Sequence, residues 1–434
     1  MTINTVTVVG ANGTMGANVS GIFASFGGAK VYMVSREIEK SRAAIIRACR
    51  SVKASSIVSH LVPVDYSSLE QCISESDLVF ESTAEDINVK IEVTTLIGKY
   101  LRPEAVACTG SSGLSIQRLA ECLPEAKRSR YFGVHMFNPP YQLTLCELTA
   151  SPYSDMDVYA GLKDYLSRVL HRTVAESKNL PAFLGNRIGF YLMNEALQYA
   201  DTYQDNGGID YIDAILGPFT GRSMPPLTTS DFVGLDVHKA IVNNIYENTC
   251  DYAHDAFILP GYAAELIDRK KLGRKSGEGL YKMVRNESGE KRLMVYDIKS
   301  GRYRDVIRYS FPFAIQMRNY LRSGEYDNAF KVLISNHSQE ADICLRFILR
   351  YIVYALYTAE HVGYDLKVAD DVMAAGFTWC PPFAWMDALS RVCDLSGLLK
   401  VRLHPDIVEQ VDIDHILAER QHSKYDYRPF FKAK

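Results

Sequence analysis

The fold is decided by Val6-Thr7-Val8-Val9-Gly10-Ala11-Asn12-Gly13-Thr14-Met15-Gly16. This β-branched run leads into a turn with three glycines, and Met15, Val19 and Phe23 then share one face of an amphipathic helix. Strand, glycine turn and helix in this order predict a nucleotide-binding unit, because glycines let backbone N–H groups and the helix N-terminus approach a pyrophosphate. The residues expected to contact the nucleotide are Gly10, Asn12, Gly13, Thr14, Met15 and Gly16.

The three glycines are spaced as GxxGxxG rather than GxGxxG, so the loop must accommodate one additional residue. An ordinary turn that enters a helix is the alternative interpretation of the glycines alone. Their position at the first β-α junction favours nucleotide binding.

Outward from this unit, short β-branched runs alternate with helical patterns up to about residue 180. That alternation predicts an α/β fold with a Rossmann-type doubly wound parallel sheet. From Pro181 onward helical spacing takes over, which predicts all-α domains after the sheet. The expected strands are Val6 to Val9, Val31 to Val34, Leu61 to Val64, Asp77 to Phe80, Val106 to Cys108 and Phe132 to His135.

Polar and turn-forming residues mark a boundary within the helical part, between Lys282 and Asp305. There, Val295-Tyr296-Asp297 and Tyr303-Arg304 flank a turn like the arms of a small hairpin. After it, Ala369 to Leu389 faintly repeats the pattern of Ile209 to Leu235, which predicts a duplicated helical module. The expected domains are a nucleotide-binding domain at 1–180, a helical domain at 181–283 and its second copy at 284–434.

Val34-Ser35-Arg36 ends the second expected strand and bears on the choice of cofactor. A domain for NAD(H) usually has an acidic residue here, which accepts hydrogen bonds from the ribose diol. A small hydroxyl and a guanidinium can instead bind a 2′-phosphate by charge-assisted hydrogen bonds. We therefore expect Ser35 and Arg36 to bind the cofactor, and NADP(H) in preference to NAD(H). The alternative is that Arg36 is a solvated loop residue in a domain that takes NAD(H).

The composition excludes several other classes of protein. The 434 residues are 47% hydrophobic and 23% charged with a net charge of −3, so no basic face for nucleic acid is expected. The most apolar stretch, Cys344 to Ala359, is interrupted by Arg346 and Arg350, which indicates a buried helix rather than a membrane span. A strand that starts almost at Met1 leaves no room for a secretion signal.

Nine cysteines without a CxxC pair fit reduced thiols in a cytoplasmic protein, with neither a disulfide framework nor a metal site.

His135-Met136-Phe137-Asn138-Pro139-Pro140 is the most specific segment for chemistry, and Glu147 follows His135 by twelve residues. His135 stands at the carboxyl end of an expected parallel strand, where open α/β sheets collect their ligands. A lone histidine is more often structural than catalytic, so its surroundings decide its interpretation.

These surroundings resemble the L-3-hydroxyacyl-CoA dehydrogenase family in six ordered blocks over about residues 4 to 282. One block, His135, Phe137, Asn138, Pro139, Leu145 and Glu147, is similar to the family's H-F-F-N-P…L-V-E with the same interval. The other blocks are Phe80 to Glu85 with Lys90, Thr109 to Ile116, Gly185-Asn186-Arg187, Asp231 to Asp236, and Leu272 to Tyr281.

The resemblance implies that His135 is the general acid/base and that Glu147 is the carboxylate that orients it. This is sensible chemistry, because hydride transfer to a ketone builds negative charge on its oxygen and calls for a proton donor that titrates near neutrality. The resemblance further implies that Ser112 and Asn186 are polar contacts at that oxygen.

By the same resemblance, Glu85 and Lys90 belong to the cofactor site. Gly110 is a departure, because the family has asparagine there, near the nicotinamide.

Several alternatives stay open for these residues. Ser111 competes with Ser112, although matching Leu114-Ser115-Ile116 to the family's L-S-I favours Ser112. Ser112 could instead cap the helix expected near Ser115, and Asn186 could cap the first long helix of the second domain. Glu147 could pair with a surface arginine.

The activity implied by the resemblance is the interconversion of an L-3-hydroxyacyl-CoA and its 3-keto form, as an oxidoreductase of fatty acid metabolism. Residues 306 to 434 resemble the second helical copy of larger members, without a hydratase domain. We therefore expect an acyl-CoA or other thioester substrate, and either a monomer made possible by the duplication or a homodimer. The alternatives are a hydroxyacid or sugar-acid dehydrogenase that does not use CoA, and a non-catalytic module that binds nucleotide or acyl-CoA.

Overall fold

The computed structural model describes residues 1–285 and 289–432. The chain forms two compact units. One consists of Met1–Phe183 with Val362–Tyr364, and the other of Leu184–His361 with Asp365–Lys434. Both helical segments that the sequence separates lie in the second unit.

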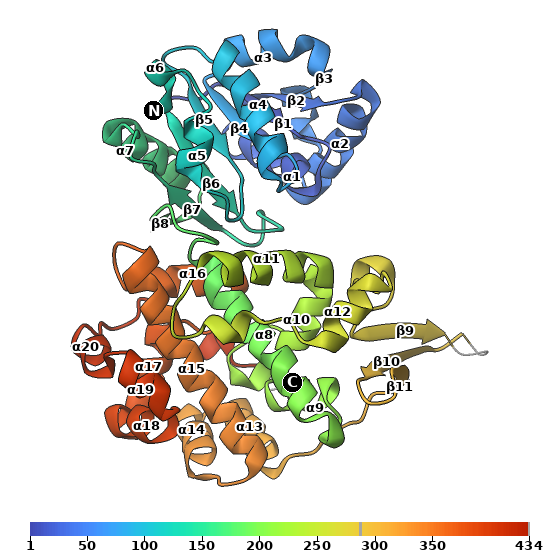
Figure 1. The fold of residues 1–434 in the computed structure, drawn as a ribbon, viewed down its shortest axis with the longest axis vertical. Helices are drawn as coiled ribbons and strands as arrows, with labels where there is room; N and C mark the ends of the chain where they lie inside the picture. Colours follow the sequence, from blue (N-terminus) through green and yellow to red (C-terminus); the bar gives the residue numbers. More distant parts are fainter. Residues whose placement is uncertain (286–288, 433–434) are drawn as a thin grey trace. The chain divides into compact units, whose positions relative to one another are not determined.

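The first unit is built on an eight-stranded sheet in the order β3-β2-β1-β4-β5-β6-β7-β8 (Figure 1). The strands β1 to β6 pair in parallel, which confirms the predicted Rossmann-type fold and all six expected strands. The strands are β1 Thr5–Val9, β2 Lys30–Ser35, β3 Leu61–Asp65, β4 Leu78–Glu81, β5 Val106–Thr109, β6 Tyr131–Met136, β7 Leu145–Thr149 and β8 Thr173–Ser177.

The strand β7 departs from the expected parallel sheet, because it runs antiparallel to β6. Only residues 137–144 connect the two strands, which is too short for the crossover that a parallel pair needs. The resulting hairpin places His135 directly opposite Glu147 in the strand register. The strand β8 then pairs in parallel with β7.

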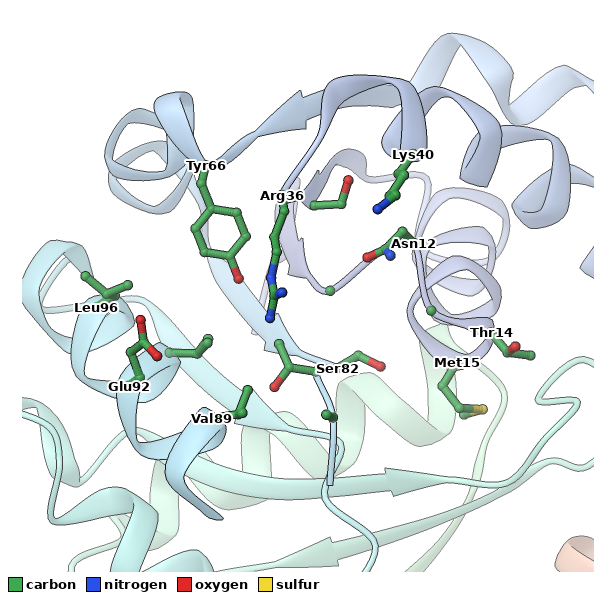
Figure 2. A pocket seen from close by; sticks show the side chains of 16 residues that line it. Asn12, Thr14, Met15, Arg36, Lys40, Tyr66, Ser82, Val89, Glu92 and Leu96 are labelled. Carbon is green, nitrogen blue, oxygen red and sulfur yellow. The ribbon is translucent and has the colours of Figure 1, made fainter. Parts of the chain in front are cut away.

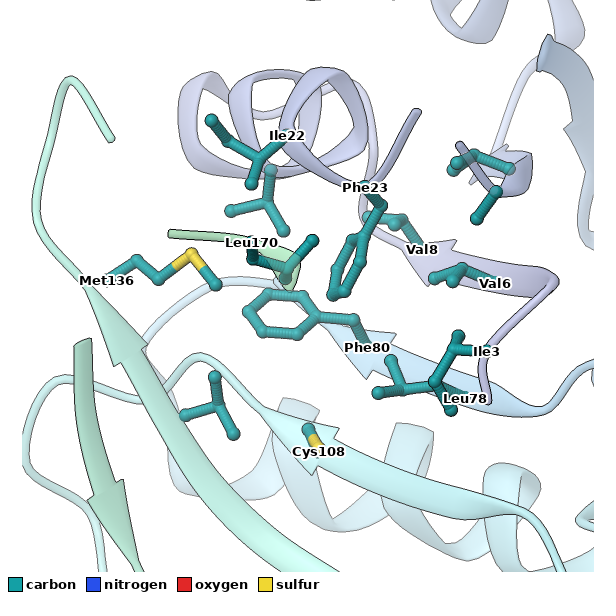
Figure 3. Close-up of a cluster of buried hydrophobic side chains, with 14 of the residues drawn as sticks. Ile3, Val6, Val8, Ile22, Phe23, Leu78, Phe80, Cys108, Met136 and Leu170 are labelled. Atoms are coloured by element: carbon teal, nitrogen blue, oxygen red, sulfur yellow. The ribbon is translucent and has the colours of Figure 1, made fainter. Parts of the chain in front are cut away.

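Helices cover both faces of this sheet, and each face has its own apolar core. On one face α1 and α2 pack against the strands, and the Phe23 ring of α1 meets Phe80 of β4 edge to face at 5.9 Å between ring centroids (Figure 3). On the other face the core includes residues of α3, α4 and α5. The helices of this unit are α1 Thr14–Ser25, α2 Ile38–Ser51, α3 Leu69–Glu75, α4 Ile87–Tyr100, α5 Ile116–Ala120, α6 Glu125–Arg128 and α7 Met156–Asp164.

The second unit is helical, apart from a three-stranded antiparallel sheet of β9 Tyr281–Arg285, β10 Lys291–Asp297 and β11 Arg302–Asp305. The pair β10 and β11 is the hairpin expected from the sequence, with Tyr296 opposite Tyr303. The helices are α8 Gly185–Thr202, α9 Ile209–Ile215, α10 Pro226–Val233, α11 Leu235–Asn248, α12 Gly261–Asp268, α13 Pro312–Arg322, α14 Tyr326–Ser335, α15 Gln339–Val362, α16 Val368–Phe377, α17 Pro382–Ser390, α18 Leu395–Arg402, α19 Pro405–Gln410 and α20 Ile413–Ala418.

The two helical segments share one local arrangement. In the first, the Asp213 carboxylate of α9 accepts hydrogen bonds from the backbone N–H groups of Leu227 and Thr228, at the start of α10. In the second, Asp370 of α16 accepts one from Phe383 at the start of α17. Burial raises the pKa of both carboxyls to about 6. Both capped helices begin with a Pro-Pro pair, which lacks the N–H groups that a helix start leaves unsatisfied.

All nine cysteines are free thiols. None of the helices among residues 1–285 and 289–432 is both long enough and apolar enough to cross a bilayer.

Candidate active site

The glycine loop follows β1 at the carboxyl edge of the sheet, and its three glycines differ in the space that a side chain would have. Gly10 has a φ of +86°, and a Cβ there would lie 2.4 Å from the Ser82 carbonyl oxygen. A Cβ on Gly16 would lie 2.3 Å from the carbonyl oxygen of Gly10. A Cβ on Gly13 would meet only ordinary contacts, the nearest at 3.4 Å. The fold therefore requires Gly10 and Gly16, whereas the bare backbone of Gly13 leaves space for a ligand.

That space belongs to a cavity of about 680 Å³ at the carboxyl ends of β1, β2 and β4 (Figure 2). Seven of the ten residues expected at the cofactor line it, namely Gly10, Asn12, Gly13, Thr14, Met15, Ser35 and Arg36. Sequence reasoning missed the rest of the lining, which is Lys40, Tyr66, Ser82, Thr83, Ala84, Val89, Glu92, Val93 and Leu96. Gly16, Glu85 and Lys90 are not among the lining residues.

Ser35, at the end of β2, was expected to bind the cofactor, but its hydroxyl makes hydrogen bonds within the protein. The Ser35 hydroxyl is buried and lies 2.8 Å from the Glu37 carbonyl and 2.6 Å from the Ser41 hydroxyl. These internal bonds occupy it. Arg36 instead extends into the cavity, where Figure 2 shows its guanidinium between Tyr66 and Asn12. Lys40 supplies a second cation to the same wall and makes an exposed ion pair with Glu37 at 2.6 Å.

The His135 and Glu147 side chains meet across the β6-β7 hairpin. Their contact joins His135 Nδ1 to Glu147 Oε2 at 2.6 Å. Glu147 is fully buried and His135 is 7% exposed, so the contact is shielded from water. A carboxylate at Nδ1 favours the tautomer with the proton on that nitrogen, which directs Nε2 toward proton exchange. The alternative that Glu147 pairs with a surface arginine would need an exposed carboxylate, whereas this one is buried.

Aromatic contacts restrict the His135 ring further. Its centroid lies 4.6 Å from that of Phe137 and 6.1 Å from that of Phe183.

The loop after β6 is held to the helix α1 that follows the glycine loop, because the Asn18 amide of α1 donates to the Asn138 side chain at 2.9 Å. Because β1 and β6 both run parallel within the sheet, the glycine loop and His135 lie at the same carboxyl edge.

The structure distinguishes the two candidate serines. The Ser111 side chain is fully buried, donates to Glu85 at 2.7 Å and accepts from the backbone N–H of Leu114 at 3.0 Å. This hydroxyl is occupied in shaping the turn, whereas Ser112 is only partly buried. The cap of α5 is Ser115, whose hydroxyl accepts from the Arg118 N–H. Ser112 is therefore not the helix cap.

Glu81 is a buried residue of this edge that the sequence analysis did not select. Both of its carboxylate oxygens accept from Lys90 Nζ, at 3.0 and 2.9 Å, and the Thr109 hydroxyl donates at 2.6 Å. Burial by itself raises the pKa of Glu81, but the charge of Lys90 and the bonds from Thr109 and Thr83 outweigh it. The pKa is lowered, so the carboxylate stays ionised. Its position at the end of β4, nine residues before a lysine, was the available signal.

Lys90 was expected at the cofactor site, but it is not among the residues that line the cavity. Its side chain is 1% exposed and lies between the carboxylates of Glu81 and Glu85. The ammonium is enclosed because two nearby carboxylates offset the cost of burying its charge.

Gly110, the departure noted from the sequence, stands beside Phe80. A Cβ there would lie 3.0 Å from the tip of the Phe80 ring. The phenyl ring occupies the space that a larger side chain at position 110 would need.

Asn186 belongs to the second unit, where it is 5% exposed and lies in the first turn of α8. The residue that precedes this helix is Leu184, so Asn186 is not its cap. That Asn186 and His135 contact the same substrate oxygen stays a prediction.

Within the described parts of the chain, no cluster of three or more histidine, cysteine or acidic side chains could hold a metal ion.

Residues 5–179 match the family model described as "3-hydroxyacyl-CoA dehydrogenase, NAD binding domain", and residues 183–283 match "3-hydroxyacyl-CoA dehydrogenase, C-terminal domain". The "3-hydroxybutyryl-CoA dehydrogenase" of Bradyrhizobium diazoefficiens is 30% identical over 209 residues, which are 48% of this chain and 69% of the relative.

A longer match is the "Probable 3-hydroxyacyl-CoA dehydrogenase" of Bacillus subtilis, 24% identical over 333 residues. These are 76% of this chain but 41% of that relative, so the chain spans less than half of its length. The crystal structure of 3-hydroxybutyryl-CoA dehydrogenase from Escherichia coli K12 has the same fold, with a TM-score of 0.67 at 19% identity. The match covers 92% of this chain and 95% of that one, so it extends over both helical segments.

Proposed function

This chain belongs to the 3-hydroxyacyl-CoA dehydrogenase family, and from that premise we propose that it interconverts an L-3-hydroxyacyl-CoA and the 3-ketoacyl-CoA. The observation that carries the proposal is the buried His135-Glu147 contact, at the same sheet edge as the glycine loop. A nicotinamide cofactor, when bound, donates or accepts the hydride. The CoA thioester is inferred from the family.

His135 is the proton-transfer group in this proposal. In the reductive direction its Nε2 donates a proton to the oxygen that was the ketone, and in the oxidative direction it removes that proton. Glu147 accepts the hydrogen bond from Nδ1 and stabilises the imidazolium. Ser112 and Asn186 support the oxygen as its negative charge develops.

The residues around the cavity fit a dinucleotide. Gly10 and Gly16 allow the tight turn, and the backbone of Gly13 is left bare for the pyrophosphate at the start of α1. Val89, Val93 and Leu96 line an apolar wall, which suits an adenine ring.

We further propose that the cofactor is NADP(H) rather than NAD(H), with Arg36 and Lys40 as the 2′-phosphate ligands. Both side chains are exposed on one wall of the cavity, and position 35 is a serine rather than the acid that usually binds the ribose diol. The Lys40-Glu37 ion pair is exposed and therefore weak, so a phosphate can compete for the lysine. Glu92 of α4 lies across the cavity from Lys40 (Figure 2).

The proposed function is tested by measuring the oxidation of NADPH and NADH with acetoacetyl-CoA and longer 3-ketoacyl-CoA substrates. We expect turnover with the CoA thioesters and none with the corresponding free 3-keto acids. Turnover of the free acids alone would support a hydroxyacid dehydrogenase instead. Absence of turnover with every substrate, together with nucleotide binding, would support a non-catalytic module.

Replacing Arg36 by alanine is expected to raise the KM for NADPH by about 10- to 100-fold, because a hydrogen bond to a charged group contributes about 1.5–3 kcal/mol. The KM for NADH is expected to stay nearly unchanged, since it lacks the 2′-phosphate. Steady-state kinetics with both cofactors measures this, and Arg42→Ala, an exposed arginine of α2 paired with Glu39, is the control. A parent protein that prefers NADH would overturn the NADP(H) assignment but leave the hydroxyacyl chemistry standing.

A further inference from the structure

The glycine loop has one residue more than the usual GxGxxG spacing, and Asn12 is that residue in the folded loop. Before it, the N–H groups of Gly10 and Ala11 both donate to the Val34 carbonyl of β2 at 3.0 Å. After it, the Gly13 N–H donates to the Gly10 carbonyl at 3.0 Å, and α1 begins. Asn12 is exposed between these bonds and lines the nucleotide cavity (Figure 2).

Arg47 of α2 holds Asn12 from outside the loop. Its Nη2 donates to the Asn12 carbonyl oxygen at 2.6 Å. That oxygen belongs to the same peptide group as the Gly13 N–H, which donates to the Gly10 carbonyl. The peptide between Asn12 and Gly13 is therefore held at both its oxygen and its nitrogen. The bond at the oxygen comes from a charged donor, which makes it the stronger kind of hydrogen bond.

Arg47 reaches the loop because α1 and α2 approach each other closely. A Cβ on Gly21 of α1 would lie 2.8 Å from the Ala48 carbonyl oxygen of α2, so the absence of a side chain there permits the approach. Ala44 and Ala48 are fully buried in the same apolar core as α1. Arg47 directly precedes Ala48 and is exposed, so its side chain leaves α2 at the edge of this packed face.

We propose that Arg47 is a positioning residue, which holds the lengthened glycine loop in the form that binds the pyrophosphate of the cofactor. For the nucleotide that the loop takes, this inference rests on the proposed function. Gly13 is the N-cap of α1 and has no side chain to cap the helix. The orientation of the peptide before Gly13 thus decides how its bare backbone and the first N–H groups of α1 face a phosphate.

Arg47→Ala is expected to raise the dissociation constants of NADPH and NADH alike by about 10-fold, the low end for a hydrogen bond that involves a charged group. Both cofactors are affected because both contain the pyrophosphate, in contrast to Arg36→Ala. Fluorescence titration measures this binding. Amide hydrogen exchange over residues 10–14 of the nucleotide-free protein is expected to accelerate, because the loop loses a contact. At saturating cofactor, kcat is expected to stay within about twofold of the parental value, because only binding is weakened.

Arg50→Ala is the matched control, since it removes an equal charge from an exposed position of the same helix. It is expected to leave both binding and exchange unchanged. Deletion of Asn12 is the second test, because it restores the GxGxxG spacing. In the shortened loop, Arg47→Ala is expected to change the dissociation constants by less than about twofold. Thermal unfolding verifies that each variant is folded, and if the deletion variant is not, the binding and exchange of Arg47→Ala decide alone.

Three results would overturn the inference. The first is exchange over residues 10–14 that stays at the parental rate in Arg47→Ala. The second is weaker binding of NADPH alone, which would place Arg47 at the 2′-phosphate. The third is an undiminished effect of Arg47→Ala in the shortened loop.

The proposed function fails separately. In that case the parent protein binds neither cofactor or shows no turnover of 3-ketoacyl-CoA, while the exchange over residues 10–14 still responds to Arg47→Ala.

Discussion

His135→Gln is expected to lower kcat for 3-ketoacyl-CoA reduction by roughly 10²- to 10⁴-fold, the range that general acid/base catalysis contributes. Glutamine retains a polar side chain of similar reach. Its amide does not titrate, however, and cannot deliver a proton as Nε2 of the His135 imidazole does. The structure favours a large effect, because the ring is 7% exposed and the site is largely shielded from water that could substitute for it. Single-turnover kinetics with 3-ketoacyl-CoA measures the loss at the chemical step.

His171→Asn is the control for this variant. His171 is an exposed histidine of the same unit with a φ of 53°, a conformation that asparagine tolerates. We expect the control to retain parental kcat and His135→Gln to retain parental cofactor binding. Undiminished turnover of His135→Gln would remove His135 from the mechanism.

Glu147→Gln is expected to lower kcat by roughly 10²- to 10⁴-fold, the upper limit being the loss seen when the carboxylate of a serine-protease triad becomes an amide. The Glu147 carboxylate lies 2.6 Å from Nδ1 and can only accept from it. A glutamine amide can donate to Nδ1 instead, which reverses the tautomer and removes the charge that stabilises the imidazolium.

Because the Glu147 side chain is fully buried, its replacement could also lower activity by unfolding the protein. Measuring the stability of Glu147→Gln separates this effect from a loss of catalysis. Circular dichroism and thermal unfolding are measured beside kcat. Glu176→Gln, on the neighbouring strand β8, is the control, since Glu176 pairs with Lys163 rather than with a histidine. A kcat loss no greater than that of Glu176→Gln would show that Glu147 does not act through His135.

The parallel part of the sheet was predictable because each strand is a short β-branched run between helical patterns, and such runs are buried on both faces. The strand β7 was not predicted. Leu145–Thr149 contains Glu147, which interrupts the apolar pattern. Its place in the sheet depends on the short connection after β6 and on the histidine that hydrogen-bonds to the buried acid.

The candidate site was predictable only in part. The glycine loop is a local feature of the sequence, and five of the six residues expected to contact the nucleotide line the cavity, all except Gly16. Ser35 could not be judged from the sequence, because the group that occupies its hydroxyl, Ser41, comes from the following helix. Lys40 and Tyr66 were missed because nothing in their own neighbourhoods marks them as ligands.

By itself, the sequence determined that the chain starts with a nucleotide-binding β-α unit and that a histidine stands twelve residues before a glutamate. These features depend on local spacing and on the steric demands of glycine. Only the tertiary structure decided that β6 and β7 form a hairpin that sets His135 against Glu147. It likewise decided that the Ser111 hydroxyl donates to Glu85, which the sequence could not distinguish from a role at the reacting oxygen. Both outcomes depend on hydrogen bonds between residues distant in sequence, which exist only after the strands have paired.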